Sequence, residues 1–119
     1  MKKVMLLEDD PTMLELLKTL LQIEGYKVKT ISNTDHIITE VQEYMPEIIL
    51  MDVHLGNGQD GGKVLTAIKA EESLADVKII MTSGSDLRKE CISNGANDFL
   101  FKPYMPDELI GKIENLIVE

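Results

Sequence analysis

Short apolar runs and longer amphipathic stretches alternate five times along this chain. Apolar runs bounded by polar residues predict buried strands, whereas apolar residues spaced three and four apart predict helices. The predicted strands are Lys3–Leu7, Tyr26–Ile31, Glu47–Met51, Val77–Met81 and Asp98–Phe101. The predicted helices are Pro11–Ile23, Thr34–Tyr44, Gly62–Glu72, Leu87–Asn94 and Pro106–Val118.

The residues around the first helix support its boundaries. Asp10 or Thr12 can cap its start, Pro11 is tolerated in its first turn, and Gly25 follows its end. Repeated strand–helix units with continuously apolar central strands predict an α/β domain, with a parallel sheet covered by helices on both faces. Right-handed crossovers favour the doubly wound, flavodoxin-like strand order 2-1-3-4-5. We expect residues 1–119 to form this single domain.

The composition narrows the function classes. Twelve Lys and Arg residues against 21 Asp and Glu residues give a net charge of −9, which argues against binding of a nucleic acid backbone by this domain. The apolar runs are far shorter than the ~20 residues that cross a bilayer. Cys91 is the one cysteine, which excludes an internal disulfide and a cysteine-based zinc site. We therefore expect a cytoplasmic protein that binds no membrane.

Acidic residues follow the first and third predicted strands. Asp52 ends the apolar run Ile48–Met51, and Glu8 and Asp9 end the run Val4–Leu7. In the order 2-1-3-4-5 these strands are neighbours, so the three carboxylates converge at one edge of the sheet. Two carboxylates about 4 Å apart repel by roughly 4 kcal/mol at an effective dielectric constant near 20, which favours a divalent cation such as Mg²⁺ or Mn²⁺. Alternatively, Glu8 and Asp9 only favour the start of the first helix.

Polar residues also follow the other two strands of this edge. Lys102 and Pro103 end the fifth strand, where a lysine can pair with a carboxylate or a phosphate and a cis peptide bond can set the turn. Thr82, Ser83 and Gly84 end the fourth strand, where a hydroxyl can hydrogen-bond an oxyanion. Each of these two segments taken alone is also consistent with an ordinary turn at the end of a strand.

Taken together, these residues closely resemble the receiver domain of two-component response regulators, and the resemblance spans the whole chain. The matching segments are Leu6–Pro11, Ile48–Leu55, Ile80–Gly84 and Gly95–Tyr104. No single segment is specific, but four segments in this order, each at the end of a strand, are.

The resemblance implies a role for each residue of the predicted edge. Asp52 would accept a phosphoryl group and form an aspartyl phosphate. Asp9, Asp52 and the backbone carbonyl of His54 would ligate Mg²⁺, Glu8 would contribute through water, and Lys102 would pair with the phosphoryl oxygens. The phosphodonor would be a histidine kinase or a phosphotransfer domain. A downstream effector protein or domain would recognise the surface of the fourth helix, the fifth strand and the fifth helix.

Two segments depart from the family pattern. The glycine-rich stretch Leu55–Gly62 is about one residue longer than usual and lacks the ending of a phosphate-binding loop, so we expect a flexible connection. The stretch Ser83–Gly95 is about three residues shorter, which predicts a short or displaced fourth helix. The resemblance also implies a hydroxyl at the end of the fourth strand that hydrogen-bonds the phosphoryl group after transfer, here called the switch hydroxyl. The shorter stretch leaves two candidates for it, Ser83, which we favour, and Thr82. Phe99 is either the aromatic switch residue or a core residue.

Three other functions are compatible with parts of the pattern. A haloacid-dehalogenase-like phosphatase would need a second aspartate where this chain has His54, and a flavodoxin-like electron carrier would not have an acidic loop after its first strand. A receiver-like module that binds proteins without phosphorylation would have no need of Asp52 and Lys102. His54, with Ser85, is expected to tune the rate of dephosphorylation, or else is a surface residue. His36 receives no function, and Cys91 is expected to be inert.

Overall fold

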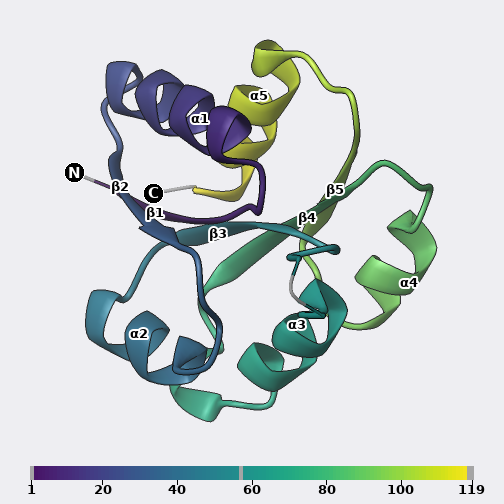
Figure 1. The fold of residues 1–119 in the computed structure, drawn as a ribbon. Helices are drawn as coiled ribbons and strands as arrows, with labels where there is room; N and C mark the ends of the chain where they lie inside the picture. The colour runs from purple at the N-terminus through teal and green to yellow at the C-terminus, as the bar shows by residue number, and fades with distance from the viewer. Residues whose placement is uncertain (1, 57, 118–119) are drawn as a thin grey trace.

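Five parallel strands form the centre of the protein (Figure 1). The computed structural model describes residues 2–56 and 58–117. The sheet has the order β2-β1-β3-β4-β5, as predicted. Its strands are β1 (Lys3–Leu7), β2 (Lys27–Ile31), β3 (Ile48–Asp52), β4 (Lys78–Ser83) and β5 (Asp98–Phe101).

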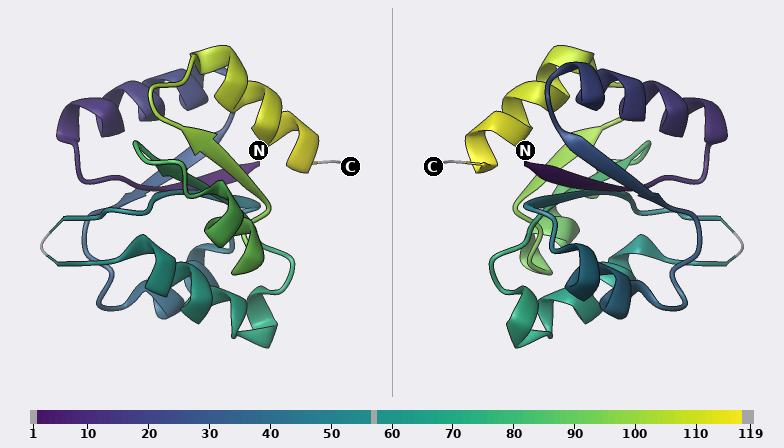
Figure 2. Two further views of the ribbon diagram at one scale, coloured as in Figure 1. Left: turned by 90° about the vertical axis from the view of Figure 1, so that its right-hand side faces the viewer. Right: turned by 90° about the vertical axis from the view of Figure 1, so that its left-hand side faces the viewer.

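Helices cover both faces of the sheet (Figure 2). The helices are α1 (Pro11–Ile23), α2 (Ile37–Tyr44), α3 (Gly61–Lys69), α4 (Arg88–Ser93) and α5 (Pro106–Leu116), with a 3₁₀ turn at Glu72–Leu74. Because side chains alternate along a strand, Leu6 and Leu50 pack under α1 and α5, whereas Met5 and Ile49 pack under α2, α3 and α4. None of the described helices is long and apolar enough to span a membrane.

Several element boundaries differ from the predicted ones by one residue, and the start of α2, the end of α3 and the end of β4 differ by more. The helix α2 begins at Ile37 rather than Thr34, because the amide of Asp35 donates to the side chain of Asn33 and forms a turn first. The helix α3 ends at Lys69, and the 3₁₀ turn follows it. The strand β4 continues to Ser83, whose carbonyl oxygen accepts from the amide of Lys102. The predicted end of the last helix at Val118 lies outside the described residues.

The register of the sheet places the candidate residues at one edge. Asp52 on β3 is the partner of Thr82 on β4, and Leu7 on β1 is the partner of Met51 on β3. The residues that follow β1, β3, β4 and β5 therefore all emerge at the carboxyl edge of the sheet, where ligands bind in open α/β sheets.

Candidate functional site

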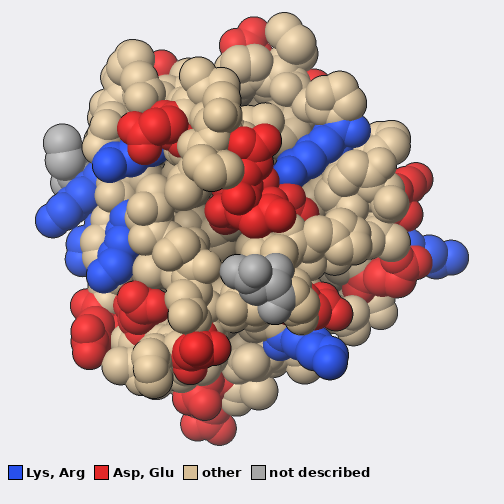
Figure 3. Space-filling model, in the orientation of Figure 1, with Lys and Arg blue, Asp and Glu red and all other residues tan. Residues whose placement is uncertain are grey.

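Three carboxylates converge where β1 and β3 end. Glu8, Asp9 and Asp52 each offer an oxygen within 4.8 Å of the others. Glu8 and Asp52 are only 8% and 6% exposed, whereas Asp9 is exposed. Figure 3 shows an acidic patch over the loop between β1 and α1. A cluster of carboxylate oxygens without a thiol or imidazole is a ligand set that suits Mg²⁺, so these residues fit the predicted cation.

Lys102 partly neutralises this cluster. Its Nζ lies 2.5 Å from Oδ2 of Asp52 and 3.1 Å from Oε2 of Glu8. The lysine reaches the pair from the end of β5, before the cis peptide bond to Pro103. Burial lowers the pKa of Lys102, but its hydrogen bonds to Asp52 and Glu8, together with the negative charge of both carboxylates, leave that pKa raised. Burial also raises the pKa of Glu8, and Lys102 offsets this only in part.

The backbone around Asp52 fixes its carboxylate. The amide of His54 donates to Oδ1 of Asp52 at 2.9 Å, which leaves Oδ2 for Lys102. The amide of Val53 donates to the carbonyl oxygen of Thr82. Gly61 begins α3 directly against this strand end, and a Cβ at Gly61 would overlap the carbonyl oxygen of Asp52. We did not predict from the sequence that position 61 requires glycine, although the pair Gly61-Gly62 after Asp60 was a signal for it.

The glycine-rich loop between β3 and α3 is a hydrogen-bonded turn where it is described. The amide of Gln59 donates to the carbonyl oxygen of Gly56, and the amide of Leu55 donates back to Gln59. Gly56 has a φ of 73°, and its backbone approaches the carboxylate of Asp9 so closely that an added Cβ would lie 3.2 Å from Oδ2. Asn57, within the predicted flexible connection, lies outside the described residues. A cavity of about 500 Å³ opens beside this loop and the acids Glu8 and Asp9.

The two candidate switch hydroxyls lie on opposite faces of β4. Because side chains alternate along a strand, Thr82 lies on the same face of the sheet as Ile80, towards α1 and α5. Ser83 lies on the opposite face, with Met81 and Phe99. Both are buried, and Oγ of Ser83 accepts from the amide of Ser85 at 3.0 Å. Ser83 therefore shares the face of Phe99, whereas Thr82 is the register partner of Asp52 and shares its face. Which of the two is the switch stays a prediction, and the register favours Thr82.

Phe99 and His54 have contrasting environments. Phe99 is 1% exposed and belongs to the core, with the guanidinium of Arg88 over its ring. His54 is exposed, and its side chain is not part of the acidic cluster. The predicted role of its carbonyl oxygen as a metal ligand is untested. The contact of Arg88 with β5 had no signal in the sequence, because it depends on how the short helix α4 is placed.

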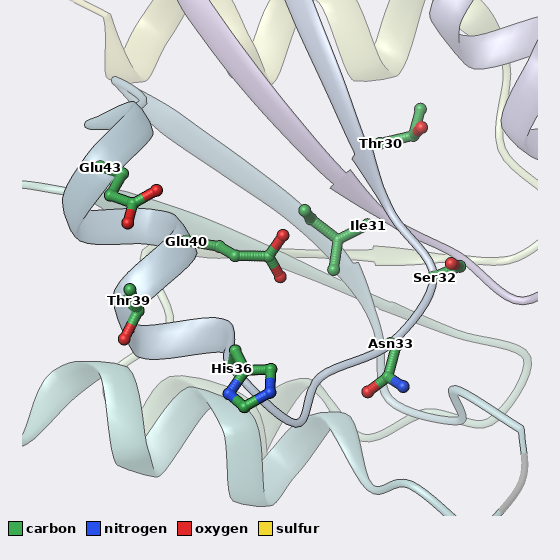
Figure 4. Close-up of a pocket in the computed structure, with 8 residues that line it drawn as sticks. All are labelled: Thr30, Ile31, Ser32, Asn33, His36, Thr39, Glu40 and Glu43. Atoms are coloured by element: carbon green, nitrogen blue, oxygen red, sulfur yellow. The ribbon is translucent and has the colours of Figure 1, made fainter.

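A second hollow lies between the end of β2 and α2 (Figure 4), and Ser32 lines both this hollow and the cavity beside Glu8 and Asp9. The second hollow measures about 440 Å³ and is lined by polar side chains, among them His36 and Glu40. His36 lies at the start of α2, and Glu40 points from α2 towards the strand end. These groups do not form a cluster of metal ligands in the described part of the chain.

Comparison with known proteins supports this arrangement. The chain is 26% identical over 112 residues to the DNA-binding response regulator MtrA of Mycolicibacterium smegmatis, covering 94% of this chain and 49% of MtrA. It is 31% identical over 111 residues to the nitrogen assimilation regulatory protein NtrX of Azorhizobium caulinodans, covering 90% of this chain and 24% of NtrX. The chain thus spans about half or less of the length of these relatives.

Among solved structures, the response regulator TrrA of Thermotoga maritima in complex with Mg²⁺ and beryllium fluoride is similar, with a TM-score of 0.86 and 28% identity over 98% of this chain and all of that one. The sequence profile described as "Response regulator receiver domain" matches residues 4–114. This chain therefore belongs to the response regulator receiver domain family.

Proposed function

We propose that this receiver domain accepts a phosphoryl group on Asp52 from the phosphohistidine of a histidine kinase or phosphotransfer domain. The observation that carries this proposal is a buried carboxylate held from both sides. The amide of His54 binds Oδ1 of Asp52, and Lys102 binds Oδ2. The residues that position a nucleophile and a counter-charge for phosphoryl transfer are thus assembled before any donor binds.

The proposed reaction is a displacement at phosphorus. A carboxylate oxygen of Asp52 forms a bond to phosphorus as the bond from phosphorus to the donor imidazole nitrogen breaks, and the imidazole keeps the electron pair and takes a proton from solvent. Lys102 can move its ammonium group from Oδ2 to an oxygen of the transferred group, and a hydroxyl at the end of β4 donates to another. The register favours Thr82, the partner of Asp52, over Ser83 for this role. A bound Mg²⁺ would neutralise charge on the transferred oxygens.

We propose that Asp9 and Asp52 hold that Mg²⁺ directly, with the carbonyl oxygen of His54, and that Glu8 contributes through water. Supporting this, the structure of the receiver domain of the sensor histidine kinase PA1611 from Pseudomonas aeruginosa has a magnesium ion in its active-site cleft, with a TM-score of 0.86 and 27% identity over 98% of this chain and 97% of that one. A cation there would relieve the repulsion that Lys102 leaves.

Phosphorylation would then act as a switch. An aspartyl phosphate adds a charge of about −1.5 to −2 and draws the hydroxyl of Thr82, the register partner of Asp52, towards it. This would shift an existing equilibrium and change the surface of α4, β5 and α5, which a downstream effector recognises. A module that works without phosphorylation is a poorer candidate. A buried pair of carboxylates lowers the stability of the protein, and such a module would gain nothing from keeping the pair.

Labelling with a small phosphodonor tests the acceptor. We expect acetyl phosphate and Mg²⁺ to add one phosphoryl group, measured by intact-protein mass, and Asp52→Ala to abolish the addition. Asp76→Ala is the matched control, because Asp76 is an exposed aspartate at the opposite edge of the sheet and should be labelled normally. Labelling that persists in Asp52→Ala would show that the acceptor is another residue.

A further inference from the structure

The guanidinium group of Arg88, at the start of α4, contacts the strand that carries Phe99. Nη2 of Arg88 donates to the carbonyl oxygen of Phe99 at 3.2 Å. The guanidinium lies over the Phe99 ring, 5.8 Å from its centroid, and Nη1 lies 3.6 Å from Oδ1 of Asp98. One side chain thus makes a hydrogen bond, a cation–π contact and an ion pair with two consecutive residues of β5.

Few apolar side chains hold α4 in place, and Cys91 and the preceding Leu87 are those that pack against the core. The helix has six residues, of which Cys91 alone is buried, and Leu87 before it provides no side-chain cap. A helix this short is not stable by itself, and a segment with few buried apolar contacts opens at low cost in free energy. The contacts of Arg88 are therefore a large share of what fixes α4 on β5.

The segment that leads into α4 is bonded to Ser83, the residue that follows Thr82 at the end of β4. Oγ of Ser83 accepts from the amide of Ser85, and the amide of Leu87 donates to the carbonyl oxygen of Ser85. Arg88 follows directly. If the hydroxyl of Thr82, on the face of Asp52, turns towards a phosphoryl group there, the end of β4 moves and the bond from Ser85 to Ser83 that shapes this segment changes. The position of Arg88 over Phe99 then changes as well.

We propose that Arg88 is a positioning residue that stabilises the unphosphorylated arrangement of α4, β5 and the Phe99 ring. This proposal rests on phosphorylation of Asp52 as the function. Contacts that exist only in the unphosphorylated arrangement reduce its conversion to the other, and so lower the apparent affinity for a phosphoryl group or a mimic of one. Loss of the Arg88 contacts should therefore make the domain easier to switch, at some cost in the stability of α4.

Binding of beryllium fluoride with Mg²⁺, which mimics the phosphoryl group, tests this inference. We expect Arg88→Met to bind the mimic more tightly than the wild type by roughly three- to tenfold, as suits a partly exposed ion pair with an added hydrogen bond. Arg88→Lys keeps a charge near Asp98 but loses the planar donor fork, so its affinity should be intermediate. Amide hydrogen exchange of Cys91 should be faster in Arg88→Met.

Lys112→Met is the matched control. Lys112 also pairs with Asp98, at 3.1 Å, but does so from α5 rather than from α4. Its removal should leave the affinity for the mimic unchanged. The inference would be overturned if urea titration shows that Arg88→Met is folded and this variant binds the mimic with wild-type affinity. An equal gain in affinity for the mimic in Lys112→Met would also overturn it. If Arg88→Met is not folded, the affinity of Arg88→Lys for the mimic decides instead, and wild-type affinity in that variant overturns the inference. Wild-type protein that fails to bind the mimic would instead contradict the proposed function at Asp52.

Discussion

The ammonium group of Lys102 lies 2.5 Å from Oδ2 of Asp52, although the two residues are 50 positions apart. The same ammonium group binds Glu8, so one cation serves two buried carboxylates. The cluster with Asp9 keeps a net negative charge, because three acids face one lysine. The stability of this edge and its affinity for cations should therefore be coupled.

Removal of the lysine tests that coupling. Without Mg²⁺, Lys102→Met should lower the free energy of unfolding by about 1–3 kcal/mol, between the values for exposed and buried ion pairs. Mg²⁺ should stabilise the variant more than the wild type, because repulsion between Glu8 and Asp52 is then relieved by the cation alone. Urea unfolding with and without Mg²⁺ measures both effects. Equal stabilisation of the two proteins by Mg²⁺ would contradict the coupling.

Two glycines form a matched pair for a test of backbone fit. Gly61→Ala should lower the free energy of unfolding by about 2–4 kcal/mol, because its Cβ would overlap the carbonyl oxygen of Asp52 and force α3 away. Gly111→Ala lies within α5 with nothing within 4 Å of the added Cβ, and should instead stabilise by about 0.5–1 kcal/mol. Chemical denaturation of both variants measures the difference. A Gly61→Ala protein as stable as the wild type would show that the strand end can move.

Tyr104 has a buried hydroxyl without a hydrogen-bond partner in the described part of the chain. Burial raises its pKa to about 12, with Lys102 opposing the shift and Glu8 adding to it. The folded protein thus keeps a proton that the unfolded chain releases near pH 10, so the wild type should lose stability as pH rises from 10 to 12. Tyr104→Phe lacks this loss, and its advantage over the wild type should grow by roughly 2 kcal/mol across that range.

At pH 7 the same substitution should leave the free energy of unfolding unchanged or slightly raised, because no hydrogen bond is lost. Tyr44→Phe is the control, since the hydroxyl of Tyr44 is also buried and lacks a partner among the described residues. Urea unfolding at several pH values measures both variants. A loss of more than about 1 kcal/mol at pH 7 in Tyr104→Phe would indicate a hydrogen bond to water or to a bound partner.

His54 offers a test of dephosphorylation. Its side chain is exposed two residues beyond Asp52, where it can hinder the approach of water to an aspartyl phosphate. We expect His54→Ala to shorten the phosphate half-life at least about twofold, which corresponds to ~0.4 kcal/mol of the barrier. The half-life follows from loss of the labelled species after the phosphodonor is removed. His36→Ala, at the start of α2, is the control. An unchanged half-life in His54→Ala would exclude the role.

Much of the fold follows from local patterns. The bounds of β1, α1 and β5 were predicted correctly, because a continuous apolar run or a regular helical period is interrupted by charged or turn residues at both ends. The strand order followed from the strand–helix repeat and the handedness of crossovers. The convergence of Glu8, Asp9 and Asp52 was then a consequence of the order, and the structure confirms it.

The sequence alone therefore determined which residues end the strands and which of them meet. Only the tertiary structure decided the contacts between residues that have no periodic relationship. The turn that delays α2, the position of Ser83 on the face of Phe99, and the approach of Gly61 to Asp52 all depend on how neighbouring elements pack. The contact of Arg88 with Phe99 is of the same kind, because a six-residue helix takes its position from the strand beneath it.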